Sequence, residues 1–369
     1  MRALTASGPG QRAGKRVAAD LLLGWSDPGR AWALLRDALP AADSQRAVVL
    51  RTFAERARAL DGPSAQRAAG EAYDLLAAAS APEDAGPLRI ESARAYAAAG
   101  DTADAGRVLR SLAGDPGAGP EARSEAAGAM VEMLARQGKP EEAERALAAA
   151  ALPGSERERL ERVIARGWLR LGALDRAALA VAADSSLAGD EVRGWVALYR
   201  GQLDEAKRLL RGAGASVGER AEAPERADAA ALLDAVRRDS LPALGAALLL
   251  AARGDSLRAS RALAAVARGL AGAGAEAEPA VLAWAARLAA AGGDSAGAEA
   301  LWSEVAVRYA SSDAAPGAEL ALSRSLARRG DVKTAVERLE AMILAHPGSA
   351  LVPEARRELD RLRGQVPGS

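Results

Sequence analysis

The sequence predicts an all-α fold in which helical hairpins stack into a solenoid. A glycine, four residues and an alanine recur seven times between apolar stretches that have helical spacing. The glycines of these copies are Gly100, Gly138, Gly172, Gly201, Gly254, Gly293 and Gly330. A glycine that ends one helix and a small residue early in the next are typical of a tight helical hairpin. Alanine, leucine and arginine, all strong helix formers, dominate the chain, whereas strand-forming residues are sparse. Repeated hairpins predict a surface that binds partners more often than an active site.

Composition excludes several classes of function. The 49 basic residues balance the 49 acidic ones, so no bulk field favours nucleic acid or an acidic membrane. The chain has no cysteine, which excludes a disulfide, a zinc–cysteine site and a thiol nucleophile. The longest apolar run, from Leu241 to Ala252, is shorter than the roughly 20 residues that span a bilayer. No signal-peptide core opens the sequence, so we expect a soluble, cytoplasmic protein as written, and a periplasmic or envelope protein if the true start lies upstream.

The order of patterns along the chain predicts its organisation. We expect a disordered lead over 1–10 and atypical helical hairpins over 11–85, with a linker-like turn from Pro82 to Pro87. Regular repeats are expected over 86–212. The interval between Gly201 and Gly254 is 53 residues, longer than the others, and it holds a Gly/Ala-rich candidate hinge over 213–225 and an extra helix. Further repeats with a polar capping helix are expected over 226–364, followed by a tail over 365–369.

The repeats resemble the tetratricopeptide repeat (TPR) family over about residues 88–364. Most glycine spacings lie near the period of about 34 residues that characterises this hairpin. With the glycine placed at the family's turn, the family's large residue four positions earlier falls on Tyr96, Leu134, Trp168, Ala197, Leu250, Ala289 and Leu326. Ala197 and Ala289 depart from the family's preference for a bulky residue. The resemblance implies a right-handed α-α superhelix with a concave inner groove.

The last two repeats carry a narrower resemblance. Tyr309-Ala-Ser-Ser followed by Pro316-x-Ala recurs 37 residues later as His346-Pro-Gly-Ser followed by Pro353-x-Ala. This cadence is similar to TPR modules of bacterial cell-envelope proteins, such as outer-membrane assembly lipoproteins and the Tol-Pal coordinator family. The resemblance implies an accessory role in envelope assembly or cell division.

No set of residues has the spacing of a catalytic, cofactor or metal site. The single histidine, His346, occupies the position that Tyr309 fills one repeat earlier, which indicates a structural role. The acidic pairs Glu141/Glu142, Asp190/Glu191 and Glu156/Glu158 are interpreted as helix-capping groups. Phosphate-binding loops and nucleophile elbows are absent from the sequence. We therefore expect no enzyme activity, no cofactor and no metal.

Arginine on one face of a helix is the main candidate for partner binding. Arg159, Arg162, Arg166 and Arg170 are three and four residues apart and so share a face, which the TPR geometry places on the concave wall. The same resemblance adds Arg94, Arg287 and Arg324 from other repeats. Guanidinium groups there could grip carboxylates of an acidic partner segment, and changing Arg162 and Arg166 to Glu tests this hypothesis. The alternative is a solvated face ion-paired to Glu158 and Glu161.

Two aromatic side chains extend the candidate surface. Trp195 and Tyr199 are four residues apart on the next inner helix and could form an aromatic floor, or pack between hairpins. The sequence thus favours a non-catalytic scaffold or adaptor that binds other proteins or peptides, with no nucleic-acid partner and no integral membrane segment. A cell-envelope accessory protein is the alternative. An α/α-toroid enzyme such as a glycosidase is a remote one, because few aromatics are present to hold sugars.

Overall fold

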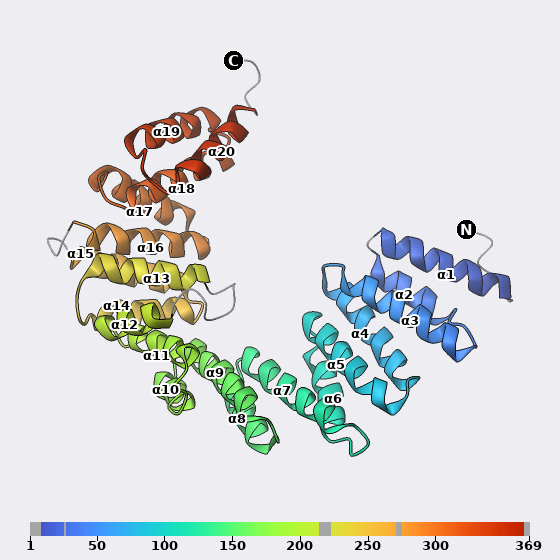
Figure 1. The fold of residues 1–369 in the computed structure, drawn as a ribbon. Helices are drawn as coiled ribbons and strands as arrows, with labels where there is room; N and C mark the ends of the chain where they lie inside the picture. The colour runs from blue at the N-terminus through green and yellow to red at the C-terminus, as the bar shows by residue number, and fades with distance from the viewer. Residues whose placement is uncertain (1–8, 26, 214–222, 271–274, 365–369) are drawn as a thin grey trace. The chain divides into compact units, whose positions relative to one another are not determined.

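The computed structural model describes residues 9–25, 27–213, 223–270 and 275–364. Twenty α-helices account for most of these residues, and apart from α13 they pack largely as successive helical hairpins (Figure 1). The predicted fold class, an all-α solenoid of TPR-like hairpins, is confirmed. Most of the expected lead, most of the expected hinge and the expected tail lie outside the described residues. The chain forms two compact units, residues 1–167 and 168–369, and the domain boundaries expected from composition stay predictions.

The N-terminal unit holds four hairpins and most of a ninth helix. Its helices are α1 (Pro9–Gly24), α2 (Pro28–Arg36), α3 (Asp43–Arg58), α4 (Pro63–Ala78), α5 (Pro82–Ala98), α6 (Thr102–Ala113), α7 (Pro120–Arg136), α8 (Pro140–Ala149) and α9 (Gly154–Leu171). The expected turn from Pro82 to Pro87 was wrong, because both prolines lie inside α5. Pro82 occupies the first position of the helix, where a backbone N–H has no intrahelical acceptor, so the missing N–H of proline costs nothing there. Pro87 lies about one turn further in and removes only one intrahelical hydrogen bond.

The C-terminal unit begins at the end of α9 and contains one helix outside the hairpin pattern. Its helices are α10 (Leu174–Ala180), α11 (Leu187–Tyr199), α12 (Leu203–Ala213), α13 (Ala223–Val236), α14 (Pro242–Ala252), α15 (Ser256–Arg268), α16 (Ala277–Ala291), α17 (Ser295–Arg308), α18 (Ala315–Arg328), α19 (Val332–Ala345) and α20 (Val352–Arg363). The extra helix expected in the long interval is α13. It packs against α12 and against α16, which belongs to the hairpin after next.

All seven repeat glycines have the same left-handed backbone conformation at the end of a helix. Their φ angles lie between +74° and +88°, in the left-handed region where a side chain is strained. In each turn the residue after the glycine donates its amide to the carbonyl five residues back, as Asp101 does to Tyr96 at 2.8 Å. The glycine amide itself bonds three residues back, as Gly100 does to Ala97 at 3.1 Å. These two bonds form the Schellman C-cap, which explains why the sequence repeats glycine at this position.

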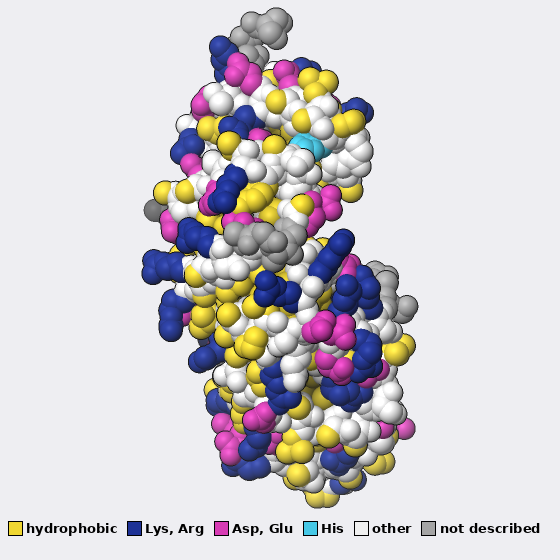
Figure 2. Space-filling model, turned by 90° about the vertical axis from the view of Figure 1, so that its left-hand side faces the viewer, with side chains coloured by type: hydrophobic (Ala, Val, Ile, Leu, Met, Phe, Trp, Pro, Cys, Tyr) yellow, Lys and Arg dark blue, Asp and Glu magenta, His cyan; other side chains and the backbone are white. Residues whose placement is uncertain are grey.

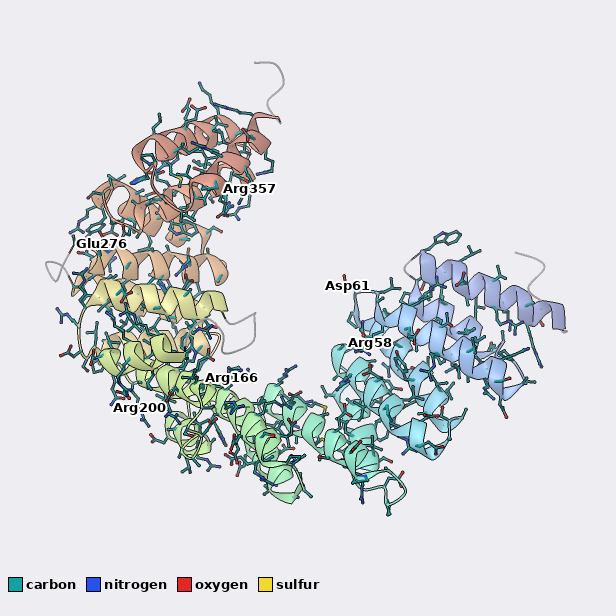
Figure 3. All side chains as sticks on the ribbon, viewed as in Figure 1. Arg58, Asp61, Arg166, Arg200, Glu276 and Arg357 are labelled. Carbon is teal, nitrogen blue, oxygen red and sulfur yellow. The ribbon has the colours of Figure 1, made fainter. Side chains whose placement is uncertain are left out.

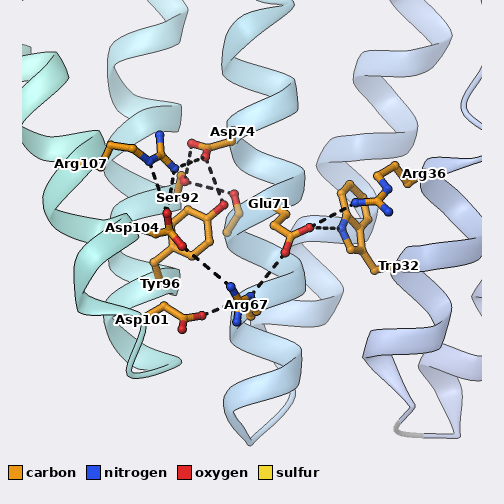
Figure 4. A network of polar contacts seen from close by, with 11 residues as sticks. Trp32, Arg36, Arg67, Glu71, Asp74, Ser92, Tyr96, Asp101, Asp104 and Arg107 are labelled. Atoms are coloured by element: carbon orange, nitrogen blue, oxygen red, sulfur yellow. Dashed lines mark hydrogen bonds and ion pairs between the residues drawn. The ribbon is translucent and has the colours of Figure 1, made fainter.

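A polar network joins four helices of the N-terminal unit (Figure 4). The Asp74 carboxylate on α4 accepts hydrogen bonds from the Ser92 hydroxyl at 2.7 Å and the Tyr96 hydroxyl at 3.1 Å, both on α5. Arg107 on α6 lies 3.5 Å from the same carboxylate. On the other side of α4, Glu71 accepts from the Trp32 indole of α2 at 2.7 Å. The network therefore ties the first regular repeat to the atypical hairpins before it.

Replacing Asp74 with alanine is expected to loosen this junction. Tyr96 is buried, so its hydroxyl would lose its acceptor away from water, at a cost of about 2 kcal/mol. The Ser92 hydroxyl would keep the Gly70 carbonyl as an acceptor at 3.1 Å. Hydrogen exchange of the α4 and α5 amides should then become roughly 30-fold faster. Asp61→Ala, in the exposed α3–α4 turn (Figure 3), is the control and should leave exchange unchanged. Equal protection in both variants would contradict a structural role for the network.

Two close contacts define the seam where α13 and α14 join the preceding hairpin. The amides of Leu203 and Asp204 donate to the Asp239 carbonyl at 2.8 and 3.1 Å, and the Leu241 amide donates to the Gly201 carbonyl at 2.8 Å. A Cβ on Gly245 would lie 2.4 Å from the Gly201 nitrogen, so α14 meets the end of α11 backbone to backbone. This contact fixes α14 against the end of α11.

A buried ion pair anchors α13 to α11. The Arg226 guanidinium donates to the Glu191 carboxylate with an Nη1–Oε1 distance of 2.8 Å, and the two side chains are 8% and 0% exposed. The interpretation of Glu191 as a capping group was therefore wrong, because it lies in the interior and binds a cation from another helix. Asp190 does lie in the first turn of α11, as expected, and Glu141 and Glu142 lie in the first turn of α8.

Across the described residues, no helix combines the length and the apolar character needed to cross a bilayer.

Candidate functional site

The predicted arginine face lies on α9. Arg159, Arg162 and Arg166 are half-buried and Arg170 is exposed, with Arg166 labelled in Figure 3. Arg159 pairs with Glu156 at 2.7 Å and with Glu132 on α7. The hydrogen bond from Arg159 lowers the pKa of Glu156. Arg162, Arg166 and Arg170 also make contacts of their own.

A cavity of about 720 Å³ in the N-terminal unit collects two of the predicted residues. Arg94 on α5 and Arg159 on α9 lie in its wall, together with Glu125 and Glu132 on α7. Arg94 bonds to Glu91 at 2.7 Å and to Glu125 at 3.0 Å. The cavity is lined by three arginines and three glutamates, so it presents no net charge to a partner.

The C-terminal unit holds a longer groove made of two adjoining cavities. The larger, of about 900 Å³, lies along α13, α16, α18 and α20. The smaller, of about 420 Å³, lies between α11, α13, α14 and α16. Both are lined by Asp228, Trp284 and Arg287, so they run into one another, and we call them together the C-terminal groove.

Alanines hollow out this groove. Small side chains from α13, α16 and α18 lie along the larger cavity, namely Ala231, Ala235, Ala280, Ala283, Ala318 and Ala321. A leucine or aromatic at these positions would fill the space between neighbouring helices, whereas alanine leaves room for an inserted segment. The alanine-rich composition of the chain therefore has a local effect at this surface as well as favouring helices.

Four of the nine predicted residues line the C-terminal groove. Trp195 and Tyr199 lie in the smaller cavity, with ring centroids 5.9 Å apart. Arg287 lies where the cavities meet, and Arg324 lines the larger one. The structure thus divides the predicted set among this groove, the N-terminal cavity and the remainder of the α9 face.

Four of the arginines in these walls share one arrangement, in which each pairs with a carboxylate of a neighbouring helix. Arg287 on α16 bonds to Asp228 on α13 at 2.8 Å, and Arg324 on α18 bonds to Glu354 on α20 at 2.6 Å. Arg94 and Arg159 make the equivalent pairs with α7. An acidic partner would have to compete with the chain's own carboxylates for these guanidinium groups. Figure 2 shows basic and acidic side chains interspersed over the face in view.

Sequence reasoning missed three groove residues, Glu225, Asp228 and Trp284. Trp284 precedes Arg287 by one helical turn, and the guanidinium lies 5.2 Å from the centroid of the Trp284 ring. The three-residue spacing of Trp284 and Arg287 in the sequence could have predicted this contact between the indole and the guanidinium. Glu225 and Asp228 reach the groove only because α13 lies beside α16, and no pattern in the sequence specifies this packing.

His346 has the structural role expected of it. It ends α19 with φ −127° and ψ 56°, as Tyr309 ends α17 with φ −125° and ψ 40°. The Ser349 amide donates to the His346 carbonyl at 3.0 Å, and the Ser312 amide donates to the Tyr309 carbonyl at 2.9 Å. Within the described part of the chain, no three carboxylate or imidazole groups lie together as a metal site would require.

Comparison with known proteins finds similarity to solved structures only. The sequence matches no family model and no curated protein. Among solved structures, two of IFIT1 in monomeric mutant forms are similar, one with Gppp-AAAA and one with m7Gppp-AAAA. Each match covers 97% of this chain and 87% of that chain at 13% identity, with a TM-score of 0.24. A TM-score of this size carries no argument about function.

Proposed function

We propose that this chain is a non-catalytic scaffold of the tetratricopeptide type that binds a segment of a partner protein in the C-terminal groove. The observation that carries the proposal is the groove itself, two adjoining cavities of about 900 and 420 Å³ along the inner helices of the repeats. Alanines supply space, three tryptophans and a tyrosine supply apolar contact area, and charged side chains complete the lining. These are the components of a peptide-binding site.

Filling the groove is expected to abolish binding. A random twelve-residue peptide library displayed on phage, selected against the full chain, should enrich peptides that bind it. Ala321→Trp, on the groove wall, should weaken the enriched peptides at least tenfold because the indole occupies their space. Ala341→Trp, on the exposed side of α19, is the matched control and should bind as the parent does. No enrichment, or equal binding by both variants, would refute the proposal.

The arginine pattern of the sequence also predicts that the partner segment is acidic, and this stays a prediction. Arg162 and Arg166 on α9, with Arg94 and Arg159 nearby, remain its proposed contacts. Because Arg94 and Arg159 are paired with the chain's own glutamates, an acidic peptide would have to exchange one carboxylate for another. Changing Arg162 and Arg166 to Glu tests it. Unchanged affinity of a partner's acidic segment would contradict it.

A second candidate is an accessory role at the bacterial cell envelope. The cadence that suggests it is also present as backbone geometry, since the turns after α17 and α19 repeat bond for bond 37 residues apart. Tagging the protein in its native host and separating envelope from soluble fractions would test this role. Recovery only in the soluble cytoplasmic fraction would contradict it. A nucleic-acid partner is not proposed, and a gel-shift assay with RNA and DNA tests that prediction.

A further inference from the structure

The smaller cavity of the C-terminal groove combines aromatic faces with negative charge. Trp195 and Tyr199 of α11 lie on one side and Trp284 of α16 on another, with Leu248 of α14 among the remaining lining residues. The carboxylates of Glu225 and Asp228 enter from α13. In the N-terminal cavity, by contrast, carboxylates and guanidinium groups are equal in number.

The charges in this cavity do not balance. Asp228 is bonded by Arg287 at 2.8 Å, which accounts for one carboxylate. Glu225 makes no ion pair with any residue that the structure describes. Two carboxylates against one guanidinium leave one negative charge in the cavity. An acidic side chain would be repelled there, and a purely apolar one would cover Glu225 without neutralising it.

The environment of Glu225 opposes its negative charge. Desolvation and the neighbouring Asp228 both raise the pKa of Glu225, although much of its side chain is exposed. Burial and the charge of Glu225 also raise the pKa of Tyr199, which lines the same cavity. A cation entering here would stabilise the charged form of Glu225.

Aromatic rings add attraction for a cation. The face of an indole or phenol ring binds guanidinium and ammonium groups through its quadrupole, most strongly where water is excluded. The chain already uses this contact once in the cavity, since the Arg287 guanidinium lies 5.2 Å from the Trp284 centroid. The rings of Trp195 and Tyr199, inclined at 32°, line the same cavity.

We propose that this cavity takes a cationic side chain, lysine or arginine, of the partner segment, held between the aromatic rings and the Glu225 carboxylate. The proposal rests on the proposed function, because it specifies one residue of the segment that the groove binds. It assigns to the C-terminal groove a preference opposite to that predicted for the arginine face of α9.

The display library described above tests the preference directly. Peptides enriched on the full chain should share a lysine or arginine at one fixed position. In synthetic versions, replacing that lysine with norleucine, or that arginine with citrulline, should weaken binding about tenfold. Against the Glu225→Gln chain the same replacement should cost about twofold or less, because the charge it contacts is gone.

Two variants keep the test interpretable. Glu337→Gln, an exposed carboxylate on α19, is the matched control and should bind the cationic peptide as the parent does. Trp195→Leu removes an aromatic face and should also reduce the preference for the cation. Circular dichroism confirms that each variant is folded. Enriched peptides without a fixed cation, or an equal penalty in the parent and Glu225→Gln, would overturn this inference alone. Failure to enrich any peptide would overturn it together with the proposed function.

Discussion

Glu191→Ala should lower the free energy of unfolding of the C-terminal unit by about 3–5 kcal/mol. Arg226 is 8% exposed, and removing its carboxylate partner leaves a guanidinium in the interior of the α11–α13 contact. The desolvation cost of that charge, rather than the lost attraction, accounts for most of the effect. Urea unfolding followed by tryptophan fluorescence measures it, because Trp195 lies on α11 beside the pair.

Two comparisons separate this explanation from a general effect of losing a side chain. Glu354→Ala breaks the Arg324 pair, whose side chains are 41% and 39% exposed, and should cost less than about 1 kcal/mol. The double variant Glu191→Leu/Arg226→Met removes both charges and should recover most of the lost stability. A double variant as unstable as Glu191→Ala would show that the buried charge is not the cause.

Gly245→Ala should destabilise the same unit by about 3 kcal/mol. The new Cβ would lie 2.4 Å from the Gly201 nitrogen and 2.7 Å from the carbonyl oxygens of Leu198 and Tyr199. All three are backbone atoms at the end of α11 and in the turn after it, so they cannot rotate away as a side chain would. The helix α14 must then move off α11, which also displaces the floor of the smaller cavity. Thermal unfolding and peptide affinity should both decline.

Gly212→Ala provides the matched control for this variant. Gly212 lies in α12, and, apart from its own helix backbone and chain neighbours, no atom of the described residues lies within 4 Å of the site of its added Cβ. Alanine there should raise stability by about 0.5–1 kcal/mol through its better helix propensity. If Gly245→Ala behaved in the same way, the backbone contact between α11 and α14 would be wrong.

The sequence was sufficient for features that depend on a single stretch of chain. The hairpin glycines were predicted because a left-handed φ excludes most other residues, and all seven have it. Arg159 and Arg166 were placed on one helix face because helical periodicity alone determines this. Local patterns also located α13 as an extra helix, although they did not determine what it contacts.

Features that depend on how separate helices meet could not be predicted. Glu191 follows Asp190 at a helix start and so resembles a capping group, yet α13 brings Arg226 onto it from 35 residues away. The partners of Arg94 and Arg287 are carboxylates on adjacent helices, and their register follows from packing that one sequence does not reveal. Pro87 was misread because proline ends helices more often than it lies one turn inside them.

The position of α13 has a consequence for how the array can change length. Solenoids gain and lose whole hairpins by duplication and deletion, since each repeat usually contacts only its neighbours. The helix α13 contacts α12 behind it and α16 beyond the next hairpin, so α14 and α15 lie within its span. Deleting the α14–α15 hairpin would remove the α14 contact with Gly201. The helices α12 and α16 would then no longer lie in the positions at which α13 contacts both of them. Variants of this chain with more or fewer repeats should therefore differ outside this segment, which would be inherited as one block.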